Sequence, residues 1–493
     1  MTVKQDSYKR IIKATSIFGG VQVFNILISI MRTKFIAVLL GPAGMGIAGL
    51  LVSTTALIGS MTNFGLATSA VRSVSVAAGD DEKIGVTVSV LRRLVWLSGI
   101  LGTLVTLSLS SFLSELTFGS KDYTVAFMAI SVTLLLAQLS AGQMVILQGM
   151  RKLKLLAKAD IAGMVLGLFT SIPIYYFLGI KGIVPAILVS SLIALACSWY
   201  FSSKIHIPKI AISSLVLKTE GLPMLKMGFM LSLSGLITVA ASYILKIFIG
   251  RTGGVEQVGF YSAGFAMINT YVGMIFTAMM TDYYPRLAEV SMDNIATKNA
   301  INEQAEIAIL IIAPILIGFI AFVDWAIILL YTDAFLVING MLHWATLGML
   351  LKTGSWAVGF IFLAKGATGI FFWSELVANI YMVMLSVLGY YLFGLNGLGM
   401  AFLAGYLLLF FQNLLVANFK YQFKFYNAFY KIFFSQFILI ILCFISIKIV
   451  VTPLSFFIGM AILVLSLLIS YRELNARLDL KQELLKIIKK RTS

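Results

Sequence analysis

Long runs of apolar residues follow one another along almost the whole chain, and short stretches between them hold most of the charged residues. A helix needs about 20 apolar residues to cross the hydrocarbon core of a bilayer. Because the runs do not alternate with period two, they predict membrane helices rather than the strands of a transmembrane barrel. Fourteen spans are expected, at residues 14–40, 45–71, 94–113, 124–149, 159–179, 183–203, 226–250, 258–281, 305–331, 340–364, 370–393, 397–418, 429–449 and 453–471.

The composition agrees with this pattern. Of the 493 residues, 60% are hydrophobic and 12% are charged, whereas soluble domains have about 45–50% apolar and about 25% charged residues. We therefore expect an all-α polytopic membrane protein. The first apolar run is too long for a signal-peptide core and no small-residue cleavage site follows it, so we expect this span to be retained.

The basic residues are divided unequally between the two sides of the membrane. With fourteen spans both termini lie on one side, which holds 29 of the 37 lysines and arginines; the other side holds four, and four lie inside spans. Lys and Arg are enriched in cytoplasmic loops, so both termini are expected to be cytoplasmic. Most of the net charge of +17 then faces anionic lipid, and no nucleic-acid partner is expected.

Two segments separated by 213 residues share one pattern. Each has a helix end, a glycine-rich turn, a glycine near the start of the next helix (Gly46 or Gly259) and a later basic residue (Arg72 or Arg286). The offset of six spans is even, so the repeats are parallel, as in transporters built from two similar halves. We expect two pseudo-symmetric six-helix lobes and two further helices. The predicted parts are an N-terminal lobe (1–203), a cytoplasmic linker (204–225), a C-terminal lobe (226–419), spans 13 and 14 (420–471) and a basic amphipathic cytoplasmic tail (472–493).

Polar side chains form stripes on several predicted spans. At 100° per residue, Gln22, Asn25 and Arg32 lie within about 80° of each other on the first span. The tenth span carries Lys352 together with Ser355 and Gly359, and the seventh carries Lys246. A polar stripe on a membrane helix should face a cavity or another helix rather than lipid.

The spans hold more cations than acids, which suits an anionic substrate such as a pyrophosphate. Asp324 is the acid that lies well inside a predicted span, and it is a candidate for ion coupling or for balancing Lys352; it could equally be an acid at the membrane interface. Arg32 and Lys34 cannot share a face, and the stripe favours Arg32; either cation could instead anchor the helix end. The predicted substrate-binding residues are Arg32, Lys34, Lys246, Lys352, Gln22 and Asn25. No catalytic residue, metal ligand or cofactor is predicted, and a proton or sodium gradient is the candidate energy source.

Several motifs resemble those of a known family. The stretches LGPAGMGIAG (40–49), NFGLA (63–67) and GVEQVGFYSAG (254–264) resemble the polysaccharide-exporter branch of the MOP superfamily. FVDWAIILLYTDAF and LKTGSWAVGFIFLAKG are similar to stretches of Wzx-type flippases for O-antigen and enterobacterial common antigen. The resemblance favours Lys34, because relatives often carry a basic residue seven positions before the first glycine of this turn. Many members have twelve spans, so the last two depart from the pattern.

The resemblance implies flipping of an undecaprenyl-pyrophosphate-linked oligosaccharide across the bacterial inner membrane by alternating access. Membrane lipids, and a polymerase and chain-length regulator of the same pathway, are the implied partners. A lipid II flippase and a MATE-like exporter of drugs or metabolites are alternatives, although an exporter of cationic drugs should have carboxylates in its cleft. A membrane polymerase or glycosyltransferase would need catalytic residues on a long external loop. All predicted external connections are short, so no enzyme is expected.

Overall fold

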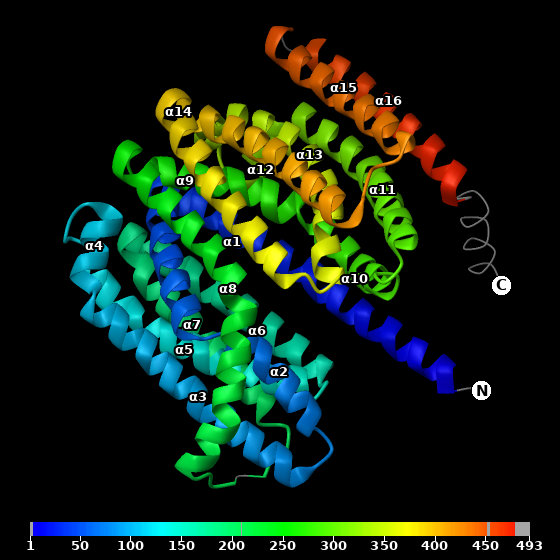
Figure 1. Cartoon of the computed structure of the whole chain (residues 1–493). Helices are drawn as coiled ribbons and strands as arrows, with labels where there is room; N and C mark the ends of the chain where they lie inside the picture. The colour runs from blue at the N-terminus through cyan, green and yellow to red at the C-terminus, as the bar shows by residue number, and fades with distance from the viewer. Residues whose placement is uncertain (1–2, 209, 451–453, 479–493) are drawn as a thin grey trace, which may run out of the picture. The chain divides into compact units, whose positions relative to one another are not determined.

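The computed structural model describes residues 3–208, 210–450 and 454–478, and this part of the chain is helical, without strands. A helix satisfies its own backbone hydrogen bonds, which is why apolar runs can cross a bilayer in this form. Two compact units are present (Figure 1). The first comprises Met1–Ser262 with Leu330–Ala334, and the second comprises Ala263–Leu329 with Phe335–Ser493.

Helices of the first unit enclose two apolar clusters, one around Leu91 and one around Phe127, both fully buried. Its elements are α1 (Val3–Thr62), α2 (Leu66–Ala77), α3 (Asp81–Ser108), α4 (Ser110–Phe118), α5 (Thr124–Gly149), α6 (Leu153–Leu178), η1 (Gly179–Gly182), α7 (Ile183–Ser202), α8 (Ser214–Gly253) and most of α9 (Val255–Ala266). Helices α3, α5, α6 and α7 pack on one another, and α8 packs on α1 and α2.

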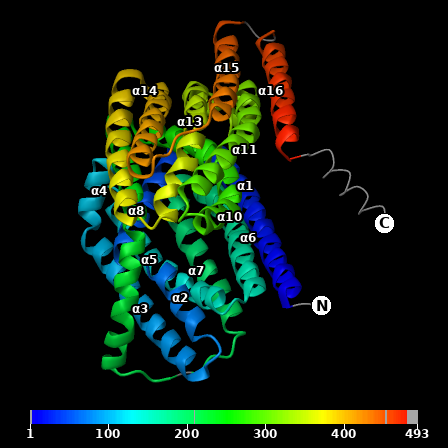
Figure 2. The same ribbon diagram turned by 45° about the vertical axis from the view of Figure 1, so that its right-hand side comes forward.

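The second unit is built around α13 and α14, which pack along each other. Its elements are η2 (Met267–Val272), α10 (Met274–Glu289), α11 (Asn294–Ala321), α12 (Val323–Leu330), most of η3 (Asp333–Ile338), α13 (Asn339–Ala364), α14 (Thr368–Tyr421), α15 (Asn427–Ile449) and α16 (Leu454–Leu478). Figure 2 shows α15 and α16 side by side along α11, and both contact it.

Eleven helical stretches within the described residues are long and apolar enough to cross a membrane. Three of them have 39, 50 and 54 residues, which exceeds one crossing: Phe24–Thr62, Leu153–Ser202 and Thr368–Tyr421. Each contains a break, at Gly41 (φ 64°), at η1 and at Gly394 (φ 57°). Dividing the three at these breaks adds three passes to the eleven, which is compatible with the fourteen predicted spans.

The two repeated segments contact each other directly inside the first unit. A Cβ atom on Gly46 would lie 1.8 Å from the carbonyl oxygen of Val255, and one on Gly259 would lie 2.0 Å from that of Pro42. The contacts are therefore reciprocal, and both residue pairs, 42 with 255 and 46 with 259, differ by the repeat offset of 213. Small residues allow membrane helices to approach this closely. Two repeats related by symmetry should make equivalent contacts with each other, and Gly46 and Gly259 do so.

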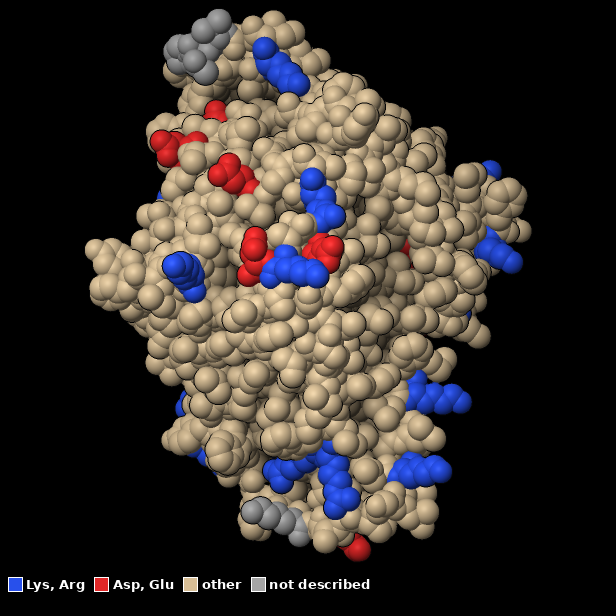
Figure 3. Space-filling view, turned by 90° about the vertical axis from the view of Figure 1, so that its left-hand side faces the viewer, with Lys and Arg blue, Asp and Glu red and all other residues tan. Residues whose placement is uncertain are grey.

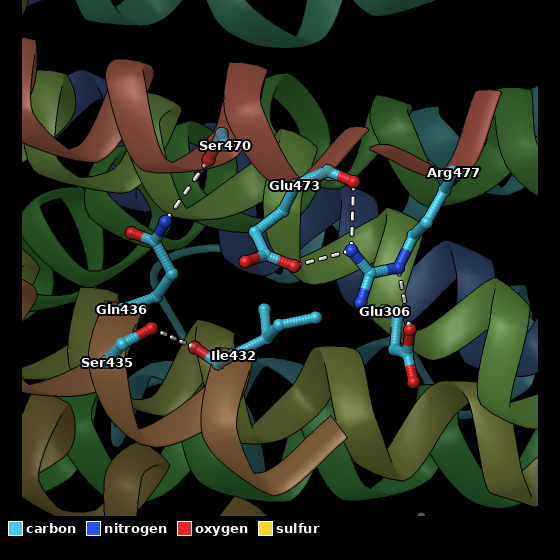
Figure 4. A network of polar contacts seen from close by, with 7 residues as sticks. All are labelled: Glu306, Ile432, Ser435, Gln436, Ser470, Glu473 and Arg477. Carbon is cyan, nitrogen blue, oxygen red and sulfur yellow. Dashed lines mark hydrogen bonds and ion pairs between the residues drawn. The ribbon is translucent and has the colours of Figure 1, made fainter. Parts of the chain in front are cut away.

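Polar contacts attach α16 to the rest of the second unit (Figure 4). The Nε atom of Arg477 donates to Glu306 of α11 at 2.9 Å, and its Nη1 atom donates to Glu473 at 2.6 Å. In the interface with α15, the buried amide of Gln436 donates to the hydroxyl of Ser470 at 3.1 Å. Helix α16 is therefore held at two points, at Ser470 by α15 and at Arg477 by α11. The contact at Arg477 is the stronger one, because charge-assisted hydrogen bonds are stronger than neutral ones.

Two predicted spans are interrupted, which corrects their expected extents. The span at 45–71 breaks at residues 63–65, where Asn63 Oδ1 accepts a hydrogen bond from the Gly65 backbone at 2.7 Å and Gly65 has φ 63°. A turn built on Asn and Gly competes with helix in this way. The span at 305–331 ends at Ala321, and the separate helix α12 follows.

Helices also extend beyond the predicted spans into the connections. Helix α8 begins inside the predicted linker, where Ser213 Oγ accepts a hydrogen bond from the Val216 backbone at 3.2 Å. Helix α16 continues to Leu478, past the predicted end of the last span at residue 471. The division into lobes, linker and tail stays a prediction, and most of the tail lies outside the described residues.

Candidate functional site

The polar stripe of α1 faces α6 within the first unit. The Nδ2 atom of Asn25 donates to the Asp160 carboxylate at 2.7 Å. Arg32 interacts with the hydroxyl of Tyr175, whose side chain is buried. The stripe therefore meets another helix, which is one of the two environments expected for it. The side chain of Gln22 lies outside the described residues.

Lys34 and Lys246 also have partners in the first unit. Lys34 donates to the backbone carbonyl oxygen of Tyr331. Lys246 of α8 donates to the hydroxyl of Ser53 on α1 at 2.7 Å. Together with Arg32, these cations hydrogen-bond three separate parts of the chain: α6, the connection at Tyr331 and α1.

Asp324 lies outside the eleven helical stretches that are long and apolar enough to cross a membrane. It is an exposed residue in the first turn of α12, and its carboxylate accepts a hydrogen bond from Asn339 at 3.2 Å. The predicted span at 305–331 is therefore interrupted before Asp324, because α11 ends at Ala321 and α12 begins at Val323. Among the described residues, no ion pair joins Asp324 to Lys352. A role in ion coupling stays a prediction.

Lys352 of α13 lines a cavity of about 260 Å³ in the second unit, which we call the Lys352 cavity. Side chains of one face of α13 form one wall, and both halves of α14 form the other. The cavity is lined by Lys352, Ser355, Trp356, Gly359, Phe360, Leu363, Phe371, Glu375, Tyr406, Leu409 and Asn413. Positions 352, 355 and 359 belong to the stripe predicted from the sequence. The structure therefore places that stripe against a cavity.

The groups in contact with the Lys352 ammonium are neutral. Its ammonium donates to Asn269 Oδ1 at 2.9 Å and lies 5.2 Å from the ring centre of Tyr406. The rings of Phe276 and Phe402 are 5.9 and 6.0 Å away. None of the ion pairs in the described part of the chain includes Lys352. Aromatic faces and an amide oxygen stabilise a cation less than a carboxylate does, so this cation is available to an anionic ligand.

Asn269 was not predicted as a site residue. It lies in η2, a π-helical turn between α9 and α10. Such turns are rare in membrane and soluble helices alike and often occur at functional sites. A single sequence shows no distinct signal for a π-helical turn, since the same residues also fit a regular helix.

Hydrogen bonds between α13 and α14 join residues that line the Lys352 cavity. The Nδ2 atom of Asn413 donates to the hydroxyl and the carbonyl oxygen of Ser355, at 3.0 and 3.2 Å. Gln412 donates to the hydroxyl of Ser374 at 2.7 Å, which ties the two halves of α14 together. Within the described residues, no group of three or more His, Cys, Asp or Glu side chains could hold a metal ion.

Comparisons with solved structures show the fold. The chain is similar to a multidrug resistance MATE family transporter of the MOP superfamily in an inward-facing conformation, with a TM-score of 0.66, 18% identity, and coverage of 81% of this chain and 94% of the other. It is also similar to the lipid II flippase MurJ in an inward closed conformation, with a TM-score of 0.68, 12% identity, and coverage of 95% and 99%. No curated protein sequence matches the chain.

The family follows from a comparison of the sequence with family models. The model described as "Polysaccharide biosynthesis protein" matches residues 35–339, which is more than half of the chain. The match covers most of the first unit and the repeated glycine segments on which the predicted resemblance depends. An all-helical membrane protein with the fold of MOP-superfamily transporters is therefore confirmed, and the chain belongs to the polysaccharide biosynthesis protein family.

Proposed function

We propose that this protein is a flippase that moves an undecaprenyl-pyrophosphate-linked oligosaccharide from the cytoplasmic to the periplasmic leaflet of the bacterial inner membrane. It would work by alternating access, as a transporter and not as an enzyme. The family match supports a role in polysaccharide biosynthesis. The fold shared with MurJ, a lipid II flippase, supports a lipid-linked substrate. A Wzx-type protein for O-antigen units is the form that the sequence motifs favour.

The observation that carries this proposal is the environment of Lys352. Its cation borders a cavity in the middle of a membrane-spanning stretch and has an amide and aromatic rings as neighbours. A charge in such a place is unfavourable by about 2.5–3.5 kcal/mol on insertion scales. A pyrophosphate would supply the missing counter-charge through hydrogen bonds worth about 1.5–3 kcal/mol each.

Reconstituted vesicles test the proposal directly. Purified protein is placed in liposomes with a fluorescent undecaprenyl-pyrophosphate-linked saccharide, and an impermeant reagent then reports how much label reaches each leaflet. We expect label to cross faster than in protein-free vesicles, and unlabelled undecaprenyl pyrophosphate to compete because the cation recognises the phosphate. Transport no faster than in empty vesicles, with folded protein, would contradict the proposal.

One observation favours a second candidate, a MATE-like exporter. Glu375 lines the same cavity as Lys352, and a carboxylate is what a cationic drug would need. A similar structure, that of the MATE multidrug transporter DinF-BH, has a TM-score of 0.59, 15% identity and coverage of 85% and 95%. Export of a cationic dye from cells, with no effect on lipid-linked glycans, would favour this candidate.

The proposal also places both termini in the cytoplasm, as the 29-to-4 distribution of basic residues predicts. On the face drawn in Figure 3, charged side chains gather in a few groups and the rest of the surface is uncharged. A reporter that is active only in the periplasm should therefore give no signal when fused after Ser493. A strong signal there would show that the orientation is inverted or the number of spans is odd.

Two further parts of the proposal concern energy and partners. A proton or sodium gradient would drive the cycle, and Asp324 remains the candidate coupling residue. The polymerase and the chain-length regulator of the same pathway would receive the flipped substrate on the periplasmic side. Running the transport assay with and without an imposed proton or sodium gradient tests the first point, because a gradient-driven flippase should show directional transport only when the gradient is present.

A further inference from the structure

The Lys352 cavity is lined by several side chains that binding of a phosphate would not require. Beyond the cation, the lining includes four aromatic side chains and one carboxylate. These are Trp356 and Phe360 of α13, and Phe371, Glu375 and Tyr406 of α14. All of these residues, like Lys352 itself, belong to the second unit.

The aromatic wall is held in place from behind. The ring centre of Trp356 lies 5.3 Å from that of Phe276, 5.4 Å from that of Tyr283 and 5.5 Å from that of Phe360. Tyr283 is fully buried and donates its hydroxyl to the carbonyl oxygen of Ala357 at 2.6 Å. The indole is therefore packed between three rings, and its orientation is set before any ligand arrives, which reduces the entropy lost on binding.

The carboxylate of Glu375 has no ion partner within the described residues. Its backbone oxygen accepts a hydrogen bond from Asn379, one turn later on α14. This contact does not involve the carboxylate oxygens. A carboxyl group can accept hydrogen bonds from several hydroxyl groups at once. The same wall thus combines a flat aromatic surface with a multiple acceptor.

The dimensions of the cavity limit what it can hold. Its lining on α13 extends over eleven residue steps from Lys352 to Leu363, which is about 16 Å along a helix axis. The volume of about 260 Å³ is below the roughly 300–1,000 Å³ of pockets that hold drug-sized ligands. An anionic group at Lys352 and one ring-sized group beside it would fill this space. A whole oligosaccharide would be too large for it.

We propose that the Lys352 cavity is a subsite for a single sugar ring joined to the phosphate that Lys352 binds. The negative π-face of Trp356 attracts the weakly positive C–H groups of a pyranose face, and Glu375 accepts hydrogen bonds from the hydroxyls at the ring edge. Because the ring must be next to the phosphate, the protein recognises the first sugar after the lipid carrier. This inference rests on the proposed function, which needs only the phosphate contact.

Binding of short soluble probes tests the subsite in the full-length protein in detergent. The probes are geranyl pyrophosphate and geranyl pyrophosphate linked to one N-acetylglucosamine, galactose or glucose. We expect at least one of the three sugars to increase affinity about tenfold over the sugarless probe. Replacing Trp356→Leu or Glu375→Gln should remove this gain and leave the affinity for geranyl pyrophosphate within about twofold.

Matched variants separate the possible outcomes. Trp373→Leu changes an exposed tryptophan of α14 outside the cavity and should leave both affinities unchanged. Trp356→Phe keeps an aromatic face and should retain most of the sugar-dependent gain, and the thermal unfolding midpoint reports whether each variant folds. If no sugar increases affinity, or if Glu375→Gln weakens both kinds of probe equally, the sugar subsite is refuted. If even geranyl pyrophosphate does not bind, the proposed function itself is refuted.

Discussion

Lys352→Met is expected to reduce the rate of flipping about tenfold to hundredfold, because it removes the charge-assisted contact to phosphate, worth about 1.5–3 kcal/mol. Methionine has a similar length and is apolar, so it should fit among Tyr406, Phe276 and Phe402 without a cavity. Lys352 is half-buried, and a cation in the middle of a membrane-spanning stretch without a carboxylate partner is itself unfavourable. We therefore expect the thermal unfolding midpoint to stay the same or rise while transport falls.

This opposite movement of activity and stability distinguishes a binding residue from a structural one. Lys352→Arg keeps the charge and should retain part of the activity. Arg92→Met removes an exposed cation of the first unit and should leave the rate within about twofold. Both properties are measured on the same preparation, by leaflet-specific quenching in vesicles and by thermal unfolding in detergent. Equal effects of Lys352→Met and Arg92→Met, or loss of stability together with activity, would remove the evidence for a substrate cation.

Gly46→Val is expected to lower the amount of folded protein in the membrane several-fold, since its Cβ atom would lie 1.8 Å from the carbonyl oxygen of Val255. Helix α1 and helix α9 would have to separate at their crossing. Even the smaller change Gly46→Ala adds this Cβ atom. It should lower the free energy of unfolding by about 1–3 kcal/mol, as overpacking of a tight core does.

The reciprocal contact supplies a second test. Gly259→Ala would place its Cβ atom 2.0 Å from the carbonyl oxygen of Pro42, so its effect should match that of Gly46→Ala. Gly235 of α8 has no atom within 4 Å of the position that a Cβ atom would take, and Gly235→Ala should be neutral or slightly stabilising. Unfolding midpoints of the three alanine variants decide the question, and a Gly46→Ala variant as stable as Gly235→Ala would contradict the close crossing.

The sequence was informative wherever helix geometry alone decides the outcome. The positions of the apolar runs were sufficient to predict a polytopic helical membrane protein, and the 100° step predicted that Lys352, Ser355 and Gly359 share one face. The neighbours of that face, Asn269 and Glu375, could not be predicted, because they depend on the register between packed helices. A single sequence carries no direct signal for such a register.

Local turn chemistry explains the errors. The break at Asn63 was missed because hydropathy does not register a side chain that hydrogen-bonds the backbone two residues later. Asp324 falls inside a predicted span for a similar reason, since the apolar stretch continues through it, whereas α11 ends at Ala321 and a new helix, α12, begins at Val323. Both positions are polar residues in apolar surroundings, and in each case the polar residue marks the end or start of a helix.

The ion pair between Arg477 and Glu306 has a consequence for relatives that differ in the number of helices. Glu306 is 8% exposed and belongs to α11, whereas its cation belongs to α16, the last helix of the described chain. In a relative that ends before α15, a carboxylate at this position would meet lipid or headgroups without its partner, which is unfavourable for an ionised group. The presence of the terminal helix pair and the residue type at position 306 should therefore covary, so that this one position reports on the length of the chain.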